Sequence, residues 1–363
     1  MNAYLTQQQR DCGVVGAGNS AHALASYLRH QGHRVHLYAR RPEQIEHLVR
    51  RPLIQASGKL EGQYELEWVG HDPAEMVRRC QTLFVCTTAT AYGDVVQQIG
   101  PHLDPEHEVI LFSSKLGGSL EVEQTLRGIG KRAVKVVETD ALFACRLQPD
   151  HSIWIRGFKE WNLFSSPRRS QTNRNQEAIQ RYFPHLEKAE NLIQRGLTDF
   201  GALAHALTVL VNMNLVDRQE EFLFYYDGYT ERTVVLLEQL EQEFQAIAKA
   251  YNTSLLPASE LLNRYYGCQT TSLLEAMRTV PNYRHSVAPQ GLETRYLSED
   301  VGCTLVPAQQ LAQLAELHTP VLDSVIAMAS VIHGVDYRLS GRTLDKLGWG
   351  DFGVREIRQW MAW

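Results

Sequence analysis

Residues 13–21 read Gly13-Val14-Val15-Gly16-Ala17-Gly18-Asn19-Ser20-Ala21. This run follows a short apolar segment and precedes an apolar helical pattern from Ala23 to Leu28. Gly16 permits a tight turn, Gly18 leaves room for phosphate groups, and Ala21 allows close packing of the helix on the strand. Backbone N–H groups at the start of such a helix bind anions. The run therefore predicts a dinucleotide site, with these binding residues: Gly16, Gly18, Asn19, Ser20 and Ala21.

The residues after this turn continue an alternating pattern. Apolar runs rich in β-forming residues alternate with helical patterns through the first half of the chain, which is typical of a doubly wound parallel sheet. The predicted strands are Cys12–Val15, Val35–Ala39, Leu83–Thr87, Val109–Ser113 and Val134–Val137.

Shorter segments fill the rest of the first half. The turn-rich residues 56–62 lead into Tyr64–Val69, which predicts a small hairpin. Ser152–Ile155 and Leu163–Ser165 are predicted as final strands, whose direction is left open. The polar stretch Ser165–Asn175 is predicted as a loop.

The second half of the chain has helical periodicity. Leu203–Leu215 is apolar on several faces and predicts a buried helix, and Thr230–Tyr251 predicts a long amphipathic helix. Pro307 is placed at a helix start, and Thr319-Pro320 precedes another helix at Val321–Ile332.

The predicted fold class is therefore α/β with two domains. An N-terminal Rossmann domain, a doubly wound sheet, spans residues 1–186, and an all-helical C-terminal domain spans residues 187–363. A fold of this kind places its active site in the cleft between the domains.

The bulk composition narrows the class of partner. The 363 residues are 44% hydrophobic and 21% charged, with a net charge of −5, which gives no reason to expect nucleic acid or a membrane as partner. The start MNAYLTQQQRD lacks the features of a signal peptide. Six cysteines occur without any C-x-x-C pair, which is typical of a reducing cytoplasm.

No metal site is predicted, although the chain has fourteen histidines. His30, His33 and His36 are spaced by three, but they cross a helix end, a turn at Gly32 and a strand. Their side chains are therefore not expected to converge.

The cofactor prediction depends on the end of the second strand. NAD-specific sites usually carry a carboxylate there that accepts from the ribose 2′-OH. This chain has Arg40 and Arg41 instead, two guanidiniums suited to a 2′-phosphate. NADP is therefore favoured, with NAD as the alternative because Glu43 lies nearby. The other interpretation of the arginines is a solvated pair.

Candidate chemistry in the second half begins with His205, which lies on an otherwise apolar helix. Reductases with this domain plan often use a lysine from the helical part, but no lysine occurs between Lys188 and Lys249. Downstream, residues 295–301 form a predicted charged loop before Pro307. Alone, His205 is also compatible with a buried core histidine, and Arg295 with a surface ion pair to Glu299.

Taken together, these segments make the chain resemble the octopine/nopaline-type opine dehydrogenases over nearly its whole length. The matching segments are the turn at 13–21, Val85-Cys86-Thr87-Thr88-Ala89-Thr90-Ala91-Tyr92, Phe183-Pro184-His185-Leu186, the helix with His205 and Asn212, Phe224-Tyr225-Tyr226-Asp227-Gly228-Tyr229-Thr230, Arg295-Tyr296 with Glu299-Asp300, Leu305-Val306-Pro307, and Thr319-Pro320. Departures from the family pattern are Asp199, Gly201, Ala206 and Gly302-Cys303-Thr304. We expect the departures on the substrate side of the cleft.

The resemblance implies reductive condensation of an amino acid, or an amine derived from one, with a 2-oxo acid such as pyruvate. The amine adds to the ketone, water leaves, and the nicotinamide hydride reduces the imine. His205 is then the general acid/base, and Asp300 fixes its tautomer. Arg295 binds a substrate carboxylate.

The remaining site assignments are less specific. Tyr296 is assigned to the substrate, and Asn212 either to the substrate or to packing. Thr87, Thr88 and Ser113 follow strands where nicotinamide and its ribose are expected.

Two other functions fit the same sequence. One is an NADP-dependent 2-oxo acid or hydroxy acid reductase, similar to ketopantoate reductase, which needs no amine. The other is a non-catalytic NADP redox sensor. A homodimer is also predicted, since Trp349, Trp360 and Trp363 form either a contact patch or a tail that docks on its own domain.

Overall fold

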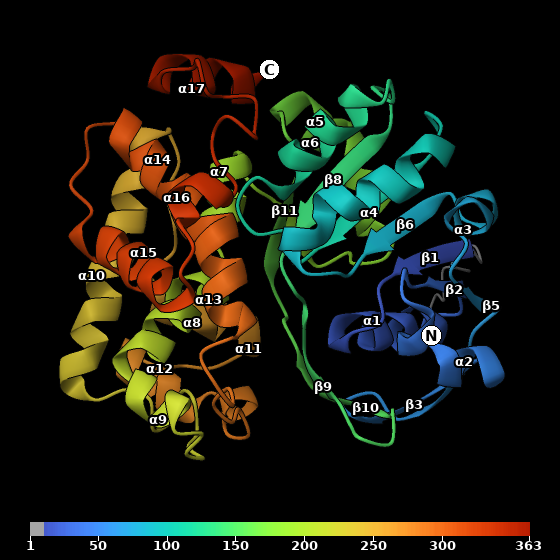
Figure 1. Ribbon diagram of the computed structural model, residues 1–363, viewed down its shortest axis with the longest axis horizontal. Coiled ribbons are helices and arrows are strands. Elements are labelled where there is room, and N and C mark those ends of the chain that lie inside the picture. The colour runs from blue at the N-terminus through green and yellow to red at the C-terminus, as the bar shows by residue number, and fades with distance from the viewer. Residues whose placement is uncertain (1–10) are drawn as a thin grey trace, which may run out of the picture.

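The computed structural model describes residues 11–363, which form two lobes (Figure 1). The prediction about a signal peptide concerns residues 1–10, which lie outside the described residues. Within residues 11–363, no helix combines the length and the apolarity needed to cross a bilayer.

The first lobe is built on an eight-stranded sheet that contains all five predicted strands. β1 (Asp11–Val15) pairs in parallel with β2 (Arg34–Tyr38) and β6 (Thr82–Val85), so the turn after β1 lies at the middle of one sheet edge. Leu163–Ser165, whose direction the sequence left open, belongs to a strand that runs antiparallel to its neighbour. In spatial order the strands are β12 (Leu186–Lys188), β11 (Asn162–Ser165), β8 (Lys135–Thr139), β7 (Glu108–Phe112), β6 (Thr82–Val85), β1 (Asp11–Val15), β2 (Arg34–Tyr38) and β5 (Trp68–Gly70).

A second, four-stranded sheet lies beneath α1 (Asn19–His30) in Figure 1. It contains β4 (Gly62–Glu65), β3 (Leu53–Gly58), β10 (Ile153–Phe158) and β9 (Phe143–Leu147), in that order. The predicted hairpin is confirmed as β3–β4. Its second arm is shorter than expected, because residues 68–70 leave it and join the main sheet as β5.

The helices of the first lobe include one that sequence reasoning missed. They are α1, α2 (Glu46–Arg50), α3 (Pro73–Arg79), α4 (Tyr92–Ile99), α5 (Gly118–Gly128) and α6 (Arg169–Gln180). The prediction of a loop at Ser165–Asn175 is wrong, because most of this segment belongs to α6. Thr172 accepts from Ser166 N at 2.9 Å, and Asn175 donates to Ser166 Oγ at 3.1 Å. These polar residues are therefore buried and hydrogen-bonded, not solvated.

The second lobe is helical, and its helices share one apolar core. They are α7 (Leu192–Leu197), α8 (Phe200–Val211), α9 (Met213–Asp217), α10 (Glu231–Ala250), α11 (Ala258–Tyr266), α12 (Leu273–Thr279), α13 (Arg295–Asp300), α14 (Val306–Leu314), α15 (Pro320–His333), α16 (Tyr337–Ser340) and α17 (Val354–Ala362). The predicted amphipathic helix is confirmed as α10. The predicted helix 203–215 breaks at Asn212 into α8 and α9.

The charged loop predicted at residues 295–301 is also wrong, because these residues begin a continuous helical run. α13 passes through a π-turn at Val301–Leu305 into α14, so Pro307 does not start a new helix. A π-turn leaves backbone groups without their usual helical partners. Here the carbonyl of Cys303 accepts from Leu116 N at 3.2 Å, and that of Gly302 accepts from Arg342 N at 2.7 Å.

The tryptophans of the C-terminal region divide between the two predicted roles. Trp349 is buried, and Trp360 packs edge-on against it with ring centroids 5.5 Å apart. Trp363 is 81% exposed. Trp349 and Trp360 therefore dock on their own chain, and only Trp363 is available for other contacts.

Candidate active site

The turn after β1 has the geometry that a dinucleotide requires. Gly16 has φ +133°, and a Cβ there would lie 3.0 Å from the Cys86 carbonyl oxygen, so only glycine fits. A Cβ on Gly18 would meet no atom within 4 Å, which leaves open space over the first turn of α1. Ala21 is fully buried between helix and sheet. The open space and the free N–H groups of the helix start fit a pyrophosphate.

Other predicted cofactor residues lie around this turn. The Asn19 side chain accepts from Leu147 N at 2.8 Å, so it ties α1 to β9, and Ser20 beside it is half-buried. Arg40 and Arg41 are both exposed after β2. Arg40 lies 3.3 Å from Asp94 of α4 in a pair that solvent screens.

Residues expected near the nicotinamide follow neighbouring strands of the main sheet. Thr87 and Thr88 come after β6, and Ser113 comes after β7. β6 and β7 are parallel and adjacent, and β6 also pairs with β1. All three residues therefore lie at the sheet edge that also carries Gly16.

The structure brings His205 and Asp300 together from α8 and α13. His205 Nδ1 lies 2.8 Å from Asp300 Oδ2, and Nε2 lies 2.9 Å from the Tyr225 hydroxyl. The imidazole stacks on Tyr296, with ring centroids 4.0 Å apart, and its side chain is 16% exposed. Because an ionised carboxylate only accepts hydrogen bonds, the proton of the neutral ring belongs on Nδ1. Nε2 then accepts from the Tyr225 hydroxyl, whose pKa burial raises well above its ordinary value.

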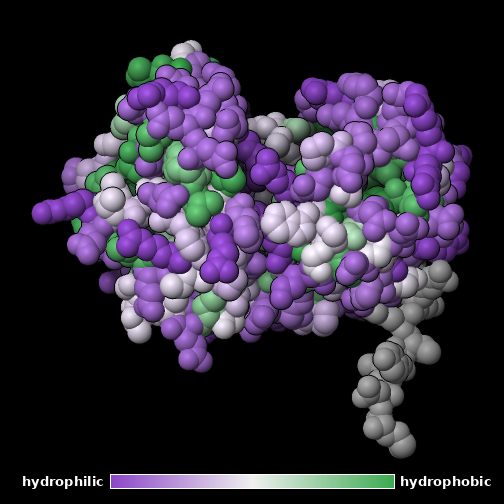
Figure 2. Space-filling view, turned by 90° about the horizontal axis from the view of Figure 1, so that it is seen from below, coloured by the Kyte–Doolittle hydropathy of each residue, from purple (hydrophilic) through white to green (hydrophobic). Residues whose placement is uncertain are grey.

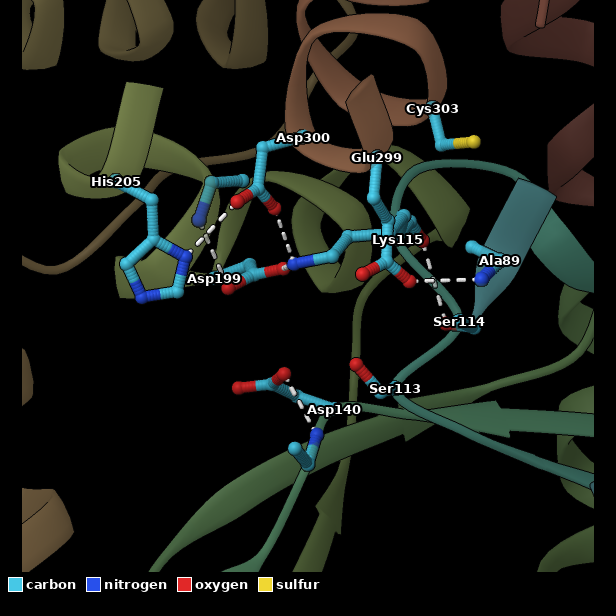
Figure 3. A network of polar contacts seen from close by, with 12 residues as sticks. Ala89, Ser113, Ser114, Lys115, Asp140, Asp199, His205, Glu299, Asp300 and Cys303 are labelled. Atoms are coloured by element: carbon cyan, nitrogen blue, oxygen red, sulfur yellow. Dashed lines mark hydrogen bonds and ion pairs between the residues drawn. The ribbon is translucent and has the colours of Figure 1, made fainter. Parts of the chain in front are cut away.

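A lysine completes this cluster from the other lobe (Figure 3). Lys115, in the loop after β7, places Nζ 2.5 Å from Asp300 Oδ1 and 2.9 Å from Asp199 Oδ2. All three side chains are at most 5% exposed. Burial opposes the lysine charge, but Asp199 and Asp300 hold the pKa of Lys115 well above its usual value. Burial likewise opposes the carboxylate charges, yet Lys115 keeps the pKa of Asp199 and of Asp300 below the ordinary range.

Sequence reasoning missed Lys115 because it looked for a lysine only in the helical half. The signal that could have found it is its place two residues after Ser113, at the end of a central strand. Asp199 was noted only as a departure from the family pattern, although it pairs with this lysine.

Arg295 and Glu299 form the predicted ion pair, at 3.2 Å, but its two ends differ. The Glu299 side chain is 3% exposed and also accepts from Ala89 N of the first lobe at 2.7 Å. The Arg295 side chain is 57% exposed, and its guanidinium lies 5.6 Å from the Tyr296 ring centroid. Arg295 can therefore still meet an anion beside the stacked Tyr296 and His205.

Asn212 has a different environment. Its amide donates to the carbonyls of Thr208 and Gly228, at 2.9 Å each. These bonds favour the packing role of Asn212 over a substrate contact.

The departures at Gly302-Cys303-Thr304 do not line an open substrate surface. These residues form the buried π-turn that contacts Leu116 and Arg342. Within residues 11–363, the structure contains no group of three or more His, Cys, Asp or Glu side chains that could hold a metal ion.

The cluster of Lys115, Asp199, His205 and Asp300 therefore lies where the two lobes meet. The space-filling view shows the molecule hollowed between these lobes (Figure 2). One lobe carries the dinucleotide turn, and the other carries the imidazole and the exposed guanidinium of Arg295. This arrangement can bind a nucleotide and an anionic substrate side by side, and its imidazole can exchange a proton with that substrate.

Comparisons with known proteins agree with this division. Residues 188–333 match the family described as NAD/NADP octopine/nopaline dehydrogenase, alpha-helical domain, and residues 12–161 match ketopantoate reductase PanE/ApbA. An opine dehydrogenase from Arthrobacter sp. (strain 1C) is 29% identical over 95% of this chain and 97% of its own length.

Two solved structures share the fold. An octopine dehydrogenase with NADH and L-arginine has a TM-score of 0.76 at 18% identity, over 96% of this chain and 98% of that chain. An NADP⁺-bound yersinopine dehydrogenase has a TM-score of 0.67 at 17% identity, over 97% and 99% of the two chains. The two-lobed architecture, a Rossmann sheet followed by a helical domain, is therefore confirmed.

Proposed function

We infer, since this chain belongs to the octopine/nopaline-type opine dehydrogenase family, that it is an NAD(P)-dependent oxidoreductase that condenses an amine with a 2-oxo acid. The amine is an amino acid or a derivative of one, and the 2-oxo acid is pyruvate or a relative. The observation that carries the proposal is the imidazole of His205, which is bonded to Asp300 where the two lobes meet. The main sheet ends at this same junction, below Lys115 and Ser113 (Figure 3).

In the proposed mechanism the chain's own residues handle the proton. His205 Nε2 takes a proton from the substrate ammonium, and the free amine adds to the ketone carbon. As the C–N bond forms, an N–H proton of the amine moves to the ketone oxygen, which gives a carbinolamine. The imidazolium then returns its proton to that hydroxyl, which leaves as water and gives the protonated imine. When bound, the nicotinamide cofactor supplies the hydride that reduces the imine. In this structure the Tyr225 hydroxyl is hydrogen-bonded to Nε2. The proton of the substrate therefore reaches the imidazole through that hydroxyl, or the substrate ammonium displaces the hydroxyl from Nε2.

Arg295 is the proposed clamp for the 2-oxo acid carboxylate, and Arg295→Gln tests it. We expect KM for the 2-oxo acid to rise about 10–100-fold, since a charge-assisted hydrogen bond contributes about 1.5–3 kcal/mol. The measurement is steady-state kinetics with the 2-oxo acid as the varied substrate. Arg264→Gln is the matched control, because Arg264 also pairs with a glutamate four residues away at 3.3 Å. An unchanged KM in Arg295→Gln would show that Arg295 does not bind the carboxylate of the 2-oxo acid.

NADP is the proposed preferred cofactor, which Arg41→Ala tests. Arg41 is exposed beside the turn, so it is free to meet a 2′-phosphate. We expect KM for NADPH to rise about tenfold or more while KM for NADH changes little, since only NADPH carries that phosphate. Arg50→Ala, which removes an exposed arginine of α2, is the control. Equal changes for both nucleotides would leave Arg41 without this role.

The overall reaction is tested by mass spectrometry of products formed from NADPH, mixed amino acids and mixed 2-oxo acids. A secondary amine that joins one of each supports the proposal. Oxidation of NADPH with a 2-oxo acid alone would favour the hydroxy acid reductase, and tight NADPH binding without turnover would favour the redox sensor.

Other properties of the chain stay predictions. They are the domain limits 1–186 and 187–363, the cytoplasmic location and the homodimer. Light scattering, which gives the molar mass in solution, tests the predicted homodimer.

A further inference from the structure

Lys115 is the one member of the charged cluster that comes from the nucleotide-binding lobe. Its ammonium contacts Asp199 at the start of α8 and Asp300 at the end of α13. His205 does not touch the lysine, but it shares Asp300 with it, since Oδ2 binds the imidazole and Oδ1 binds Nζ. Any change in the lysine charge therefore reaches the imidazole through this carboxylate.

The loop that carries Lys115 is held in an unusual shape. Ser113 and Lys115 have φ values of +77° and +61°, in the left-handed region that disfavours residues other than glycine. Such a conformation persists only when its surroundings fix it.

Two buried arginines fix this loop. Arg342 donates to the carbonyls of Ser114 and Leu116 at 3.0 and 3.1 Å. Arg195 donates to the carbonyl of Lys115 and binds Glu138 at 2.7 Å. Both arginines belong to the second lobe, so the backbone of this first-lobe loop is anchored across the junction, which fixes the position of the ammonium.

We propose that Lys115 is a positioning residue that sets the charge which Asp199 and Asp300 present to His205, and so sets the proton affinity of the catalytic imidazole. The catalytic part of this statement rests on the proposed function. Because Ser113 lies two residues earlier, at the predicted nicotinamide end, the proton chemistry is tied to the lobe that binds the cofactor.

The charges around the imidazole make the proposal specific. One ammonium and two carboxylates leave a single net negative charge behind His205. The other groups that face the ring are neutral Tyr225 and Tyr296, and Arg295 lies beyond Tyr296 beside Glu299. Removing only the Asp199 charge brings the net charge to zero, and removing Lys115 as well restores the single negative charge.

The test therefore compares Asp199→Asn with the double variant Asp199→Asn/Lys115→Met. Asparagine is as good a helix N-cap as aspartate, so the bond from Ala202 N, now 3.1 Å, can be kept. The double variant leaves no unpaired buried lysine, and neither variant leaves two unpaired carboxylates together.

The readout is the NMR titration of the His205 imidazole in the full-length protein with ¹³C-labelled histidine, assigned with His205→Gln. We expect Asp199→Asn to lower the titration midpoint by about one pH unit, since it removes a nearby negative charge. Adding Lys115→Met should raise the midpoint back toward the wild-type value. Lys135→Met is the control, because it removes a lysine paired with Glu108 at the opposite end of β7.

The proposal would be overturned if Asp199→Asn did not shift the midpoint, or if adding Lys115→Met left it unchanged or lowered it further, because a merely structural lysine does not reverse the sign. The acidic limb of the kcat/KM profile should follow the same order where turnover is measurable. If no amine and 2-oxo acid pair is turned over, the proposed function fails, but the titration still decides the role of Lys115.

Discussion

His205→Ala is expected to lower kcat by about 10²–10⁴-fold, the usual contribution of a positioned general acid/base. The imidazole is the one proton carrier that lies between Asp300 and the hydroxyl of Tyr225, and its partner carboxylate is buried. Without it, neither ammonium deprotonation nor loss of water has a local proton carrier. KM for the 2-oxo acid should change far less, because Arg295 is the proposed carboxylate contact. Steady-state NADPH oxidation with amine and 2-oxo acid measures both constants.

His333→Gln is the matched control for this substitution. His333 also lies on a helix of the second lobe and contacts a tyrosine hydroxyl, that of Tyr337, at 2.6 Å. It has no proposed part in the reaction, so its kcat should stay close to wild type. Turnover of His205→Ala within a few-fold of wild type would remove the imidazole from acid–base work.

The sheet was predictable because parallel strands in this fold are buried on both faces. Their sequences are continuous apolar runs, so β1, β6 and β7 could be located to within two residues of their ends. The dinucleotide turn was equally accessible, since Gly16 has to be glycine for a backbone reason that is local. Local constraints of this kind are visible in the sequence without any knowledge of distant contacts.

Helix α6 and the run through Pro307 could not be predicted in the same way. In α6 the polar side chains of Thr172 and Asn175 are satisfied by Ser166 and a strand, which the sequence presents only as polarity. At Pro307 the helix continues because a π-turn precedes the proline, and its freed carbonyls bind Leu116 and Arg342. Both outcomes depend on partners far away along the chain.

The residues of the candidate site also depend on contacts between distant parts of the chain. His205 and Asp300 are 95 residues apart, and their pairing came from family resemblance, not from periodicity. Lys115 was missed because its role depends on charges that only the folded chain brings to it. The departure at Asp199 is therefore understandable as a partner for this lysine.

Asp300→Asn is expected to lower kcat by up to about 10⁴-fold, the loss found when the carboxylate that orients a catalytic histidine is made an amide. Asparagine has nearly the same shape, so the helix can keep its packing. It presents an N–H donor as well as an oxygen, however, and it no longer fixes the proton on Nδ1. The imidazole then spends time in the tautomer that cannot take a proton at Nε2. Lys115 keeps its bond to Asp199, so the loop after β7 retains one buried anchor.

Two measurements separate this loss from general damage to the fold. Asp323→Asn, which alters a half-buried carboxylate that accepts from Gln309 on a neighbouring helix, should keep kcat near wild type. NADPH binding by Asp300→Asn, followed by fluorescence, should also stay close to wild type, because the dinucleotide turn at Gly16 and Gly18 lies in the other lobe. An orienting role for Asp300 requires that kcat fall while NADPH binding does not. If kcat in Asp300→Asn stays within about threefold of wild type, the carboxylate does not orient the imidazole, and its buried contacts serve only to hold α13 against α8 and against the loop after β7.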